Sequence, residues 1–464
     1  TITLQYQLID AQNHPCRIWM KYSKDGGQFF DTVIQSQLSG DAGSGILPGA
    51  RTITWNYAGL SGTIYNTKIK LYASDNQPID ISEIVKKVDS SRVYQNLKFV
   101  CGERNINSAP NHFYLIRDSI ERIFKRNQLL TEKDQFSYNA QTGVNILGLK
   151  AGAIDEKPTV VVDAHYDGVV GTPGADDNAT GVAGMLEAVR VLSGYEYENS
   201  IRFIGFDFEE AGLIGSQRYV QNGIKKNETI TGVLNLEMIG YYTNKANTQS
   251  LPTGFNVLFP DVYNAIIADS SRGNFIVVCG NANSNSLIND YMKAASTYVP
   301  KLKALSVEVP SNGQIAPDLR RSDHASFWDN NNKALMMTDG SNFRNKNYHK
   351  PSDTIGSINL SFMTNVTKAT IATAAMIAKP ISAGYDDLDL STLSYNAPHL
   401  HNTEMLWTVY PNPSDGNVSV KINADNFMHA KMELYDLNGK LIWEKVFELK
   451  RGDNEVKPDF KNLK

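Results

Sequence analysis

The stretch "VVVDAHYDGVVGTPGADDNATG", residues 160–181, decides the fold of the largest part of this chain. It opens with a continuous apolar run, which is typical of a strand buried on both faces of a parallel sheet. One histidine and four aspartates stand within or directly behind that run. Buried carboxylates without a partner are strongly unfavourable. The sequence therefore predicts that something positively charged lies among these side chains.

Length and composition limit the possible classes of protein. At 464 residues the chain is long enough for roughly two to four domains. Hydrophobic residues make up 41% and charged residues 20%, as in soluble globular proteins. The net charge is -4 and no basic block is present, which argues against a nucleic-acid or membrane-surface role. No run of about 18 apolar residues is present, so we expect no membrane span. The start at Thr1, without a signal-like segment, suggests a processed N-terminus.

The first part of the chain has the pattern of a small β domain. Residues 1–80 alternate apolar and polar positions, as in "TITLQYQLID" and "TKIKLYAS", and contain the Gly-rich segments "KDGGQ" and "SGDAGSG". Short strands at regular spacing with such turns predict a β-sandwich. No titratable cluster stands out there, so a spacer or interaction module is the simplest interpretation.

Residues 81–383 change to a pattern of alternating strands and helices. Strand-like runs such as "TVVVDAHYD" and "NSIRFIGFDF" alternate with helical stretches such as "NATGVAGMLEAVRVLSG". This order predicts an α/β domain with a mostly parallel mixed sheet and helices on both faces. In such sheets ligands bind at the carboxyl ends of the strands. The site is therefore expected there.

Acidic and histidine residues follow several of these predicted strands. Mixed histidine and carboxylate ligands suit zinc or a similar divalent ion. The stretches "VVVDAHYD", "PGADDNATG", "FIGFDFEEAG", "VLNLEMIG" and "NYHKPSDT" carry them: His165, Asp167, Asp176, Asp177, Glu209, Glu210, Glu237 and His349. Of these, Asp176 is interpreted as a residue that orders the loop beside Asp177.

Five of these motifs, in this order, resemble the metal-site motifs of the bacterial di-zinc aminopeptidases. They are "HYD", "GADDNATG", "DFEEAGLIGSQRYV", "NLEMIG" and "YHKPSDT", and the resemblance covers residues 85 to 380 approximately. The same superfamily includes glutamate carboxypeptidase and glutaminyl cyclase. The resemblance implies two Zn²⁺ ions and hydrolysis of N-terminal residues from peptides with a free N-terminus.

The resemblance also assigns a role to each matching residue. His165 and Glu237 would bind one zinc, Glu210 and His349 the other, and Asp177 both. Asp167 would hydrogen-bond His165 and fix its tautomer. Glu209 would be the general base, and Tyr348 would contact the oxyanion. Arg321 is a weaker match to a substrate contact.

Glu237 departs from the family pattern, which has Asp before the Met of this motif. The extra methylene moves the carboxylate by roughly 1.5 Å. Occupancy of the zinc at His165, and the preference for a free amine, depend on this position. Met238, Ile239, Tyr241 and Tyr242 follow it and are expected to line an apolar substrate pocket.

The C-terminal part has a different composition. Residues 384–405 are polar, contain Pro and have no helical period, which predicts a linker. Residues 406–464 contain two hairpin-like strand pairs with "PNP" and "LNG" turns. This segment resembles part of the C-terminal sorting domain of the type IX secretion pathway of Bacteroidetes. The resemblance implies delivery to the cell surface or the medium, with the secretion machinery as partner.

The sequence thus favours a secreted zinc aminopeptidase and leaves two alternatives open. One is a glutaminyl-cyclase-like zinc acyl transferase, and the other is a non-catalytic surface receptor on the same fold. The "HYD" motif argues against the cyclase, and the full set of five motifs argues against the receptor. Fold alone does not decide between them.

Overall fold

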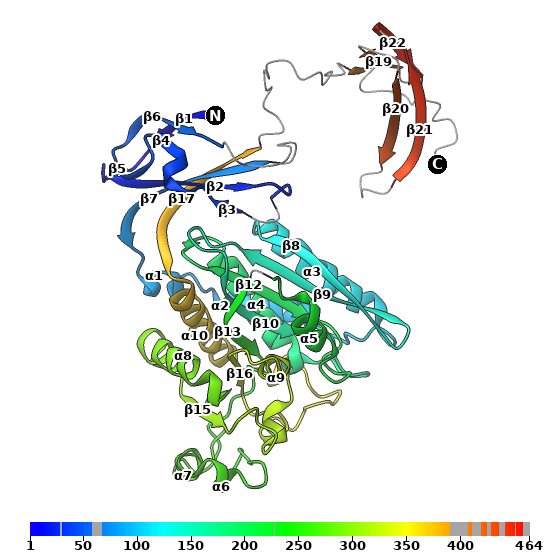
Figure 1. The fold of residues 1–464 in the computed structure, drawn as a ribbon. Coiled ribbons are helices and arrows are strands. Elements are labelled where there is room, and N and C mark those ends of the chain that lie inside the picture. Colours follow the sequence, from blue (N-terminus) through cyan, green and yellow to red (C-terminus); the bar gives the residue numbers. More distant parts are fainter. Residues whose placement is uncertain are drawn as a thin grey trace. The chain divides into compact units, whose positions relative to one another are not determined.

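The computed structural model of the chain divides into two units, residues 1–392 and 393–464 (Figure 1). It describes residues 1–27, 30–57, 67–226, 228–389, 407–410, 419–424, 428–435, 441–450 and 452–457. The first unit contains an N-terminal β-sandwich and an α/β region, and the second contains the C-terminal strands. None of the helices in these ranges is long and apolar enough to cross a membrane.

An eight-stranded mixed sheet forms the centre of the α/β region. Its strands lie in the order β15-β14-β16-β13-β10-β12-β9-β8. Parallel pairing joins β12, β10, β13 and β16, whereas β8 and β9 pair antiparallel at one edge. The bounds are β8 (Leu130–Tyr138), β9 (Gln141–Lys150), β10 (Pro158–His165), β12 (Ser200–Phe206), β13 (Thr229–Leu236), β14 (Ile276–Asn281), β15 (Ala304–Val309) and β16 (Ala334–Thr338).

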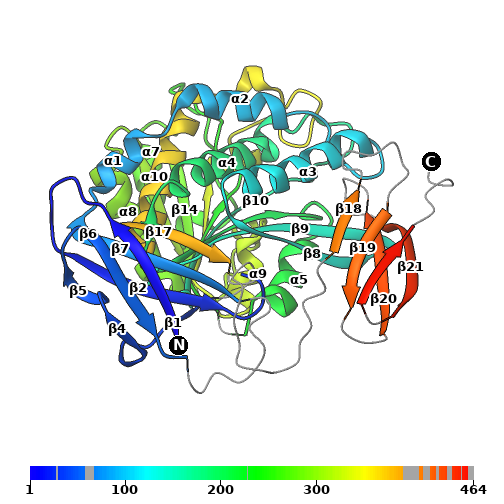
Figure 2. The ribbon, with the colours of Figure 1, turned by 90° about the horizontal axis from the view of Figure 1, so that it is seen from above.

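Helices cover both faces of this sheet, which confirms the predicted fold class. Figure 2 shows α2, α3 and α4 along one face, with α5 and α9 on the other. The first face carries α1 (Ile81–Lys86), α2 (Ser90–Val100), α3 (Pro110–Arg126), α4 (Gly181–Leu192), α8 (Asn285–Tyr298) and α10 (Leu360–Ala378). The second carries α5 (Ile214–Arg218), α6 (Phe255–Leu258), α7 (Pro260–Ala268) and α9 (His324–Asp329).

The apolar run quoted at the start is the central strand β10. Val160 and Val162 pack into the core on the first face, and Val161 packs into the core on the second. Successive side chains of a strand point to opposite faces, so a strand covered on both sides needs apolar residues throughout. This is why the run is continuous instead of alternating.

The N-terminal residues form the expected sandwich of two sheets. One sheet has the order β1-β6-β4, with β1 (Ile2–Leu8), β6 (Gly49–Trp55) and β4 (Leu38–Gly40). The other has the order β11-β17-β7-β2-β3, and β5 (Gly43–Ile46) pairs with β2. Its strands are β11 (Glu196–Tyr197), β17 (Pro380–Asp389), β7 (Lys68–Pro78), β2 (Cys16–Ser23) and β3 (Asp31–Thr32). The two sheets share a core that includes Ile18, Ile53, Trp55 and Ile69.

Strand β17 corrects the predicted linker. Residues 384–389 were predicted to begin the linker, and this is wrong because they pair antiparallel with β7. Asp386 and Asp387 of this strand are exposed, so polar residues are tolerated there. The strand therefore lacks the apolar pattern by which a buried strand is predicted. The remaining linker residues, 390–405, lie outside the described residues.

The second unit contains two small antiparallel sheets. One has the order β18-β19-β22, and the other pairs β20 with β21. The bounds are β18 (Trp407–Tyr410), β19 (Ser419–Ala424), β20 (Met428–Tyr435), β21 (Leu441–Leu449) and β22 (Gly452–Val456). Val420, Leu449 and Val456 form its described core. The two turns predicted here lie outside the described residues.

Candidate metal centre

The predicted site residues gather at one edge of the eight-stranded sheet. His165 is the last residue of β10. Glu209 and Glu210 follow β12, and Glu237 directly follows β13. Because β12 and β13 both pair in parallel with β10, the carboxyl ends of the three strands meet at this edge.

Two loops bring the remaining residues to the same edge. Asp177 lies in the irregular turn η2 (Ala175–Thr180), directly before α4. His349 lies in the loop between β16 and α10, and its φ is 56°. The two side chains meet, with His349 Nε2 at 3.0 Å from Asp177 Oδ2. Residues far apart in the sequence thus form one cluster.

Three carboxylates surround the imidazole of His165. Its Nε2 atom is 3.4 Å from Asp177 Oδ1, 3.4 Å from Glu237 Oε2 and 3.9 Å from Glu209 Oε2. This nitrogen is buried and has no hydrogen-bond partner in the described part of the chain. Buried polar atoms are almost always paired in native proteins. An unpaired buried imidazole nitrogen of this kind is suited to bind a metal ion.

Asp177 lies between the two histidines. Its Oδ1 faces His165 and its Oδ2 faces His349, which is also 3.3 Å from Glu210 Oε2. The other oxygen of Glu210, Oε1, is buried and lacks a hydrogen-bond partner among the described residues. The cluster therefore has two halves that share the carboxylate of Asp177.

The acids shift the pKa values of both histidines upward. Burial opposes a charge on His165, but Glu209 and Glu237 raise the pKa of this imidazole well above its usual range. Burial likewise opposes a charge on His349, and hydrogen bonds to Asp177 and Glu210 raise its pKa to about 10. Both imidazoles lie in strongly negative surroundings.

The carboxylates respond in two opposite ways. Burial raises the pKa of Glu209 well above its ordinary value, and it raises the pKa of Glu210 to about 7 with help from the charge of Asp177. Burial acts on Asp177 too, but His165 and His349 hold the pKa of Asp177 below its ordinary value. The two histidines do not balance all of the acids, so the cluster lacks positive charge.

Asp167 organises the two glutamates. Its Oδ1 accepts the backbone N–H of Glu209 and its Oδ2 that of Glu210, each at 3.1 Å. The carboxylate is also 3.5 Å from His165 Nδ1, and the hydrogen-bond contact of this nitrogen, at 3.3 Å, is the backbone oxygen of Asp167. Asp167 thus holds the backbone of the Glu209–Glu210 pair and faces the imidazole of His165.

Glu237 reaches the cluster in spite of its longer side chain. Its Oε2 atom accepts a hydrogen bond from the Ser322 hydroxyl at 2.8 Å and lies 3.4 Å from His165 Nε2. The serine fixes the direction of the carboxylate. Ser322 was missed in the sequence because nothing local links it to a strand end so far away in the chain.

Tyr348 stands at the exposed side of the cluster. Its ring stacks on His349 with 3.7 Å between the centroids, and its hydroxyl accepts a hydrogen bond from Arg321 Nη2 at 2.9 Å. Burial raises the pKa of Tyr348 above its ordinary value. The phenol is therefore neutral at physiological pH, and its proton is free to be donated.

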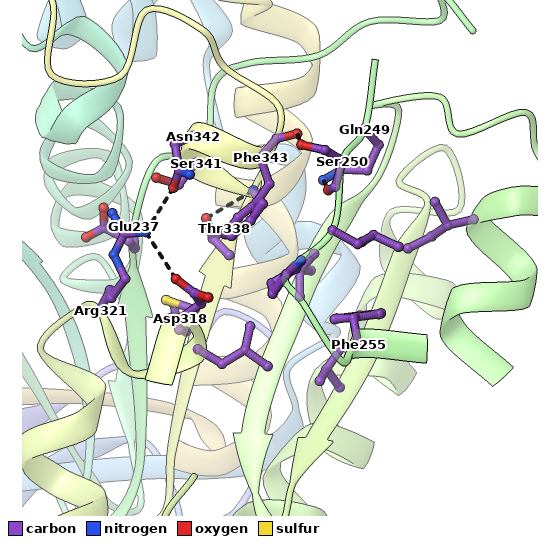
Figure 3. Close-up of a pocket in the computed structure, with 18 of the residues that line it drawn as sticks. Glu237, Gln249, Ser250, Phe255, Asp318, Arg321, Thr338, Ser341, Asn342 and Phe343 are labelled. Atoms are coloured by element: carbon purple, nitrogen blue, oxygen red, sulfur yellow. Dashed lines mark hydrogen bonds and ion pairs between the residues drawn. The ribbon is translucent and has the colours of Figure 1, made fainter. Parts of the chain in front are cut away.

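A pocket lies beside the cluster, and Glu237, Arg321 and Tyr348 belong to its lining. In Figure 3, dashed lines connect Arg321 with Asn342 and with Asp318 at its rim; the distances are 2.9 and 3.6 Å. The wall is mostly apolar and comes from α6, α7 and the strands next to them: Phe255, Val262, Ile266, Phe275, Val307 and Met336.

The predicted pocket residues are different from those observed. Met238 and Ile239 are fully buried, and neither they nor Tyr241 and Tyr242 line this pocket. The chain turns sharply at Met238, whose φ is 51°, so the residues after Glu237 run away from the pocket into the core. The apolar wall comes from helices α6 and α7 and from strands outside the five motifs.

Two further residues order the turn that carries Asp177. Asp176 accepts hydrogen bonds from the Gly240 N–H and the Asn345 amide, which agrees with its predicted role in ordering the loop. Asp353 accepts the backbone N–H groups of Asp176 and Asp177 at 3.1 to 3.2 Å. Asp353 belongs to the "YHKPSDT" motif but was not assigned a role from the sequence.

The donor set fits zinc. Ligand atoms of His165, Glu209 and Glu237 lie within 4.8 Å of one another, as do those of His165, Asp177 and Glu210. Imidazole nitrogens with carboxylate oxygens are a common ligand set of catalytic zinc. His165 Nε2 and Glu210 Oε1 are unpaired among the described residues, so both atoms are available as metal ligands. Cys16, Cys101 and Cys279 are free and do not belong to the cluster.

Comparisons with known proteins agree with this chemistry. The model of "Peptidase family M28" matches residues 145–374, and that of "Secretion system C-terminal sorting domain" matches residues 408–464. The uncharacterized protein YfbL of Escherichia coli is 31% identical over 225 residues, which are 46% of this chain and 65% of that protein. Aminopeptidase YwaD of Bacillus subtilis is 42% identical over 113 residues, which are 24% and 25% of the two chains. The chain thus spans less than two thirds of these relatives.

A solved structure has the same fold over the α/β region. The aminopeptidase from an Aneurinibacillus species superimposes with a TM-score of 0.50 at 16% identity, covering 65% of this chain and 97% of that one. The sorting domain marks the protein as one that is secreted or carried to the cell surface. The first family model covers every strand end and loop that supplies the clustered side chains, so residues 145–374 are a Peptidase family M28 domain.

Proposed function

We propose that this protein is a secreted zinc aminopeptidase that removes N-terminal residues from peptides. The observation that carries the proposal is the position of Asp177 between two histidines, each of which has further carboxylates beside it. Such an arrangement suits two metal ions that share one carboxylate. The apolar pocket beside the cluster supports a substrate with one side chain to bury.

The residues divide between the two proposed ions. His165 and Glu237 would hold one zinc, and Glu210 and His349 the other, with Asp177 as the shared ligand. The short distances within each half support this division. Two ions held in this way would polarise the scissile carbonyl and acidify the attacking water.

Glu209 is the proposed general base. Its side chain lies 3.9 Å from His165 Nε2, at the inner side of the cluster, and its backbone N–H is fixed by Asp167. Burial raises its pKa, which makes it a better proton acceptor once ionised. Glu209 would take the proton of the water and pass it to the leaving amine.

Tyr348 and Arg321 are the proposed contacts to the substrate carbonyl oxygen. The phenol accepts its hydrogen bond from Arg321, so its own proton is free to be donated. A donor aimed at the developing negative charge lowers the barrier, and the loss of one such donor costs about 10²-fold or more in rate. The guanidinium of Arg321 holds the phenol in place and adds positive charge nearby.

Glu237 connects the metal centre with the pocket, and this supports recognition of a free amine. Its carboxylate faces His165 and also belongs to the pocket lining. A substrate with its first side chain in the pocket would bring its ammonium group next to this carboxylate. The pairing is strong because the surroundings are shielded from water.

The test compares two forms of one peptide, one with a free N-terminus and one with an acetylated N-terminus. We expect kcat/KM for the acetylated form to be at least about a hundredfold lower, which corresponds to roughly 2.7 kcal/mol. Equal cleavage of both forms would contradict the proposal. Ring closure of an N-terminal glutamine without cleavage would identify a cyclase, and zinc-loaded protein inert towards every peptide would identify a receptor.

A further inference from the structure

Arg104 is a buried cation directly behind the metal centre. It lies between α2 and α3, its side chain is 1% exposed, and none of its recorded hydrogen bonds goes to a carboxylate. A buried guanidinium needs partners for its five N–H donors. The acceptors of these hydrogen bonds indicate the structural role of Arg104.

All acceptors of Arg104 are backbone carbonyl oxygens. Its Nε atom donates to Tyr166 at 3.0 Å, and its Nη2 atom donates to Gly174 at 2.9 Å and to Asp177 at 3.2 Å. Its Nη1 atom donates to Val100, Gly102 and Pro173 at 2.9 to 3.2 Å. One side chain therefore connects its own loop with both ends of the connection between β10 and α4.

The two ends of this connection carry proposed metal ligands. Tyr166 stands between His165 and Asp167, so its carbonyl lies in the backbone that aims both side chains. Asp177 is the residue placed between the two histidines. Because the guanidinium is planar and rigid, it sets the spacing between the two ends of this connection.

The turn at Asp177 is held from two directions. Arg104 binds the carbonyl oxygens of Gly174 and Asp177, whereas Asp353 accepts the N–H groups of Asp176 and Asp177. Gly174 makes the approach possible, since its φ is 54° and a Cβ there would lie 2.8 Å from Arg104 Nη2. The backbone of this turn therefore packs against the guanidinium of Arg104.

Arg104 also supplies charge where the cluster needs it. Its positive charge interacts with those of Asp177 and Asp167, which lie on the opposite side of the same turn. A fixed cation behind these carboxylates reduces their mutual repulsion without occupying the place of a metal ion. Arg104 therefore supports the metal centre both by its hydrogen bonds and by its positive charge.

We propose that Arg104 is the positioning residue of the metal centre: it joins the two ends of the β10–α4 connection and so fixes the distance between the ligands His165 and Asp177. The inference rests on the proposed function in one respect only, namely that these residues bind zinc. It does not depend on which substrate is cleaved.

The experiment measures zinc affinity in the full chain, by competition with a chelator, for the wild type, Arg104→Met and Arg202→Met. Arg202 is the matched control, because it is a buried arginine whose guanidinium pairs with Glu228 at 2.8 Å, away from the site. We expect Arg104→Met to raise the zinc Kd at least about tenfold, as loss of outer ligand partners does. Arg202→Met should lower Tm but leave the zinc Kd within about twofold.

An unchanged zinc Kd in Arg104→Met, with a fall in Tm like that of Arg202→Met, would overturn the inference. If Arg104→Met does not fold, Arg104→Lys replaces it, since lysine keeps the charge but its single nitrogen cannot bind both ends of the connection. We expect its zinc Kd to rise at least about threefold, and a wild-type value would overturn the inference. Wild-type protein that binds zinc but cleaves no peptide would refute the proposed function alone.

Discussion

The metal centre and the junction between the sandwich and the large sheet both contain many buried charged groups. The two regions differ in whether these groups are paired. At the junction, Lys21 Nζ lies 2.7 Å from Glu156 Oε1 and donates to the Gly152 oxygen at 2.6 Å. Lys150 pairs with Glu196 in the same region. At the metal centre, by contrast, His165 Nε2 and Glu210 Oε1 are buried without a partner among the described residues.

We infer from this difference that the paired charged groups at the junction have a structural role, whereas those at the metal centre have a functional role. A buried ion pair whose members satisfy each other holds two elements together, and nothing further is needed to explain it. A buried cluster of carboxylates with unpaired ligand atoms is unfavourable by itself and is suited to hold a cation. Changes at the junction should therefore affect stability alone, whereas changes at the centre should affect activity.

The largest effect is expected from Lys21→Met at the junction. The change leaves Glu156 buried without a cation, which costs about 3 to 5 kcal/mol of unfolding free energy. Denaturant unfolding of zinc-loaded protein would measure this loss, while kcat of the folded protein should stay at the wild-type value. The double variant Lys21→Met/Glu156→Leu should recover most of the stability, because no buried charge is left alone. A large fall in kcat of folded Lys21→Met would contradict the proposal that the junction affects stability alone.

The opposite pattern is expected from Glu209→Gln at the metal centre. Loss of the general base should lower kcat by about 10²-fold or more, at least roughly 2.7 kcal/mol, while zinc content and stability stay near normal. Elemental analysis and steady-state kinetics on one preparation would measure both quantities. Loss of zinc with Glu209→Gln but not with Glu210→Gln would reverse the roles proposed for these two residues.

A smaller effect is expected from Val262→Phe in the pocket. The larger side chain narrows the apolar wall, so kcat/KM for a leucyl substrate should fall at least about tenfold relative to an alanyl substrate. The control is Val257→Phe on the neighbouring helix, since Val257 is 75% exposed and does not line the pocket. Equal effects of both variants, or no change in the leucyl to alanyl ratio, would show that the pocket does not bind the first side chain.

The smallest effect is expected from removal of the C-terminal unit. Residues 393–464 form a unit of their own, so a chain cut after residue 392 should keep the kcat and KM of the full chain within about twofold. A cut at residue 383 should instead destabilise the protein, because it removes most of β17 from the sheet that contains β7. Inactive or aggregated protein after the first cut would show that the sorting domain supports the catalytic unit.

Local sequence patterns predicted the α/β region well and its connections poorly. The apolar run of β10 and the alternation of strands and helices are local features, and they led to the correct fold class. Residues 384–389 of β17 were taken for linker because they are polar and partly exposed, and because the partner strand β7 lies some 300 residues earlier in the chain. Long-range pairing of this kind leaves no period in the sequence.

In the site, too, residues in local motifs were predicted and residues that depend on long-range contacts were missed. The ligand candidates were found because they stand at strand ends and inside short motifs, and the structure brings His165, Asp177, Glu210, Glu237 and His349 together. Arg104 was missed because its acceptors are backbone carbonyls, which no residue pattern encodes. The pocket was misplaced because the turn at Met238 depends on backbone geometry.

The most direct test of the central claim is a crystal structure of the zinc-loaded protein with anomalous data collected at the zinc edge. The account predicts two peaks roughly 3.5 to 4 Å apart, one next to His165 and Glu237 and the other next to Glu210 and His349. Both peaks should contact the carboxylate of Asp177. A single peak, or a second peak that does not touch Asp177, would contradict the shared-ligand centre on which the proposed function depends.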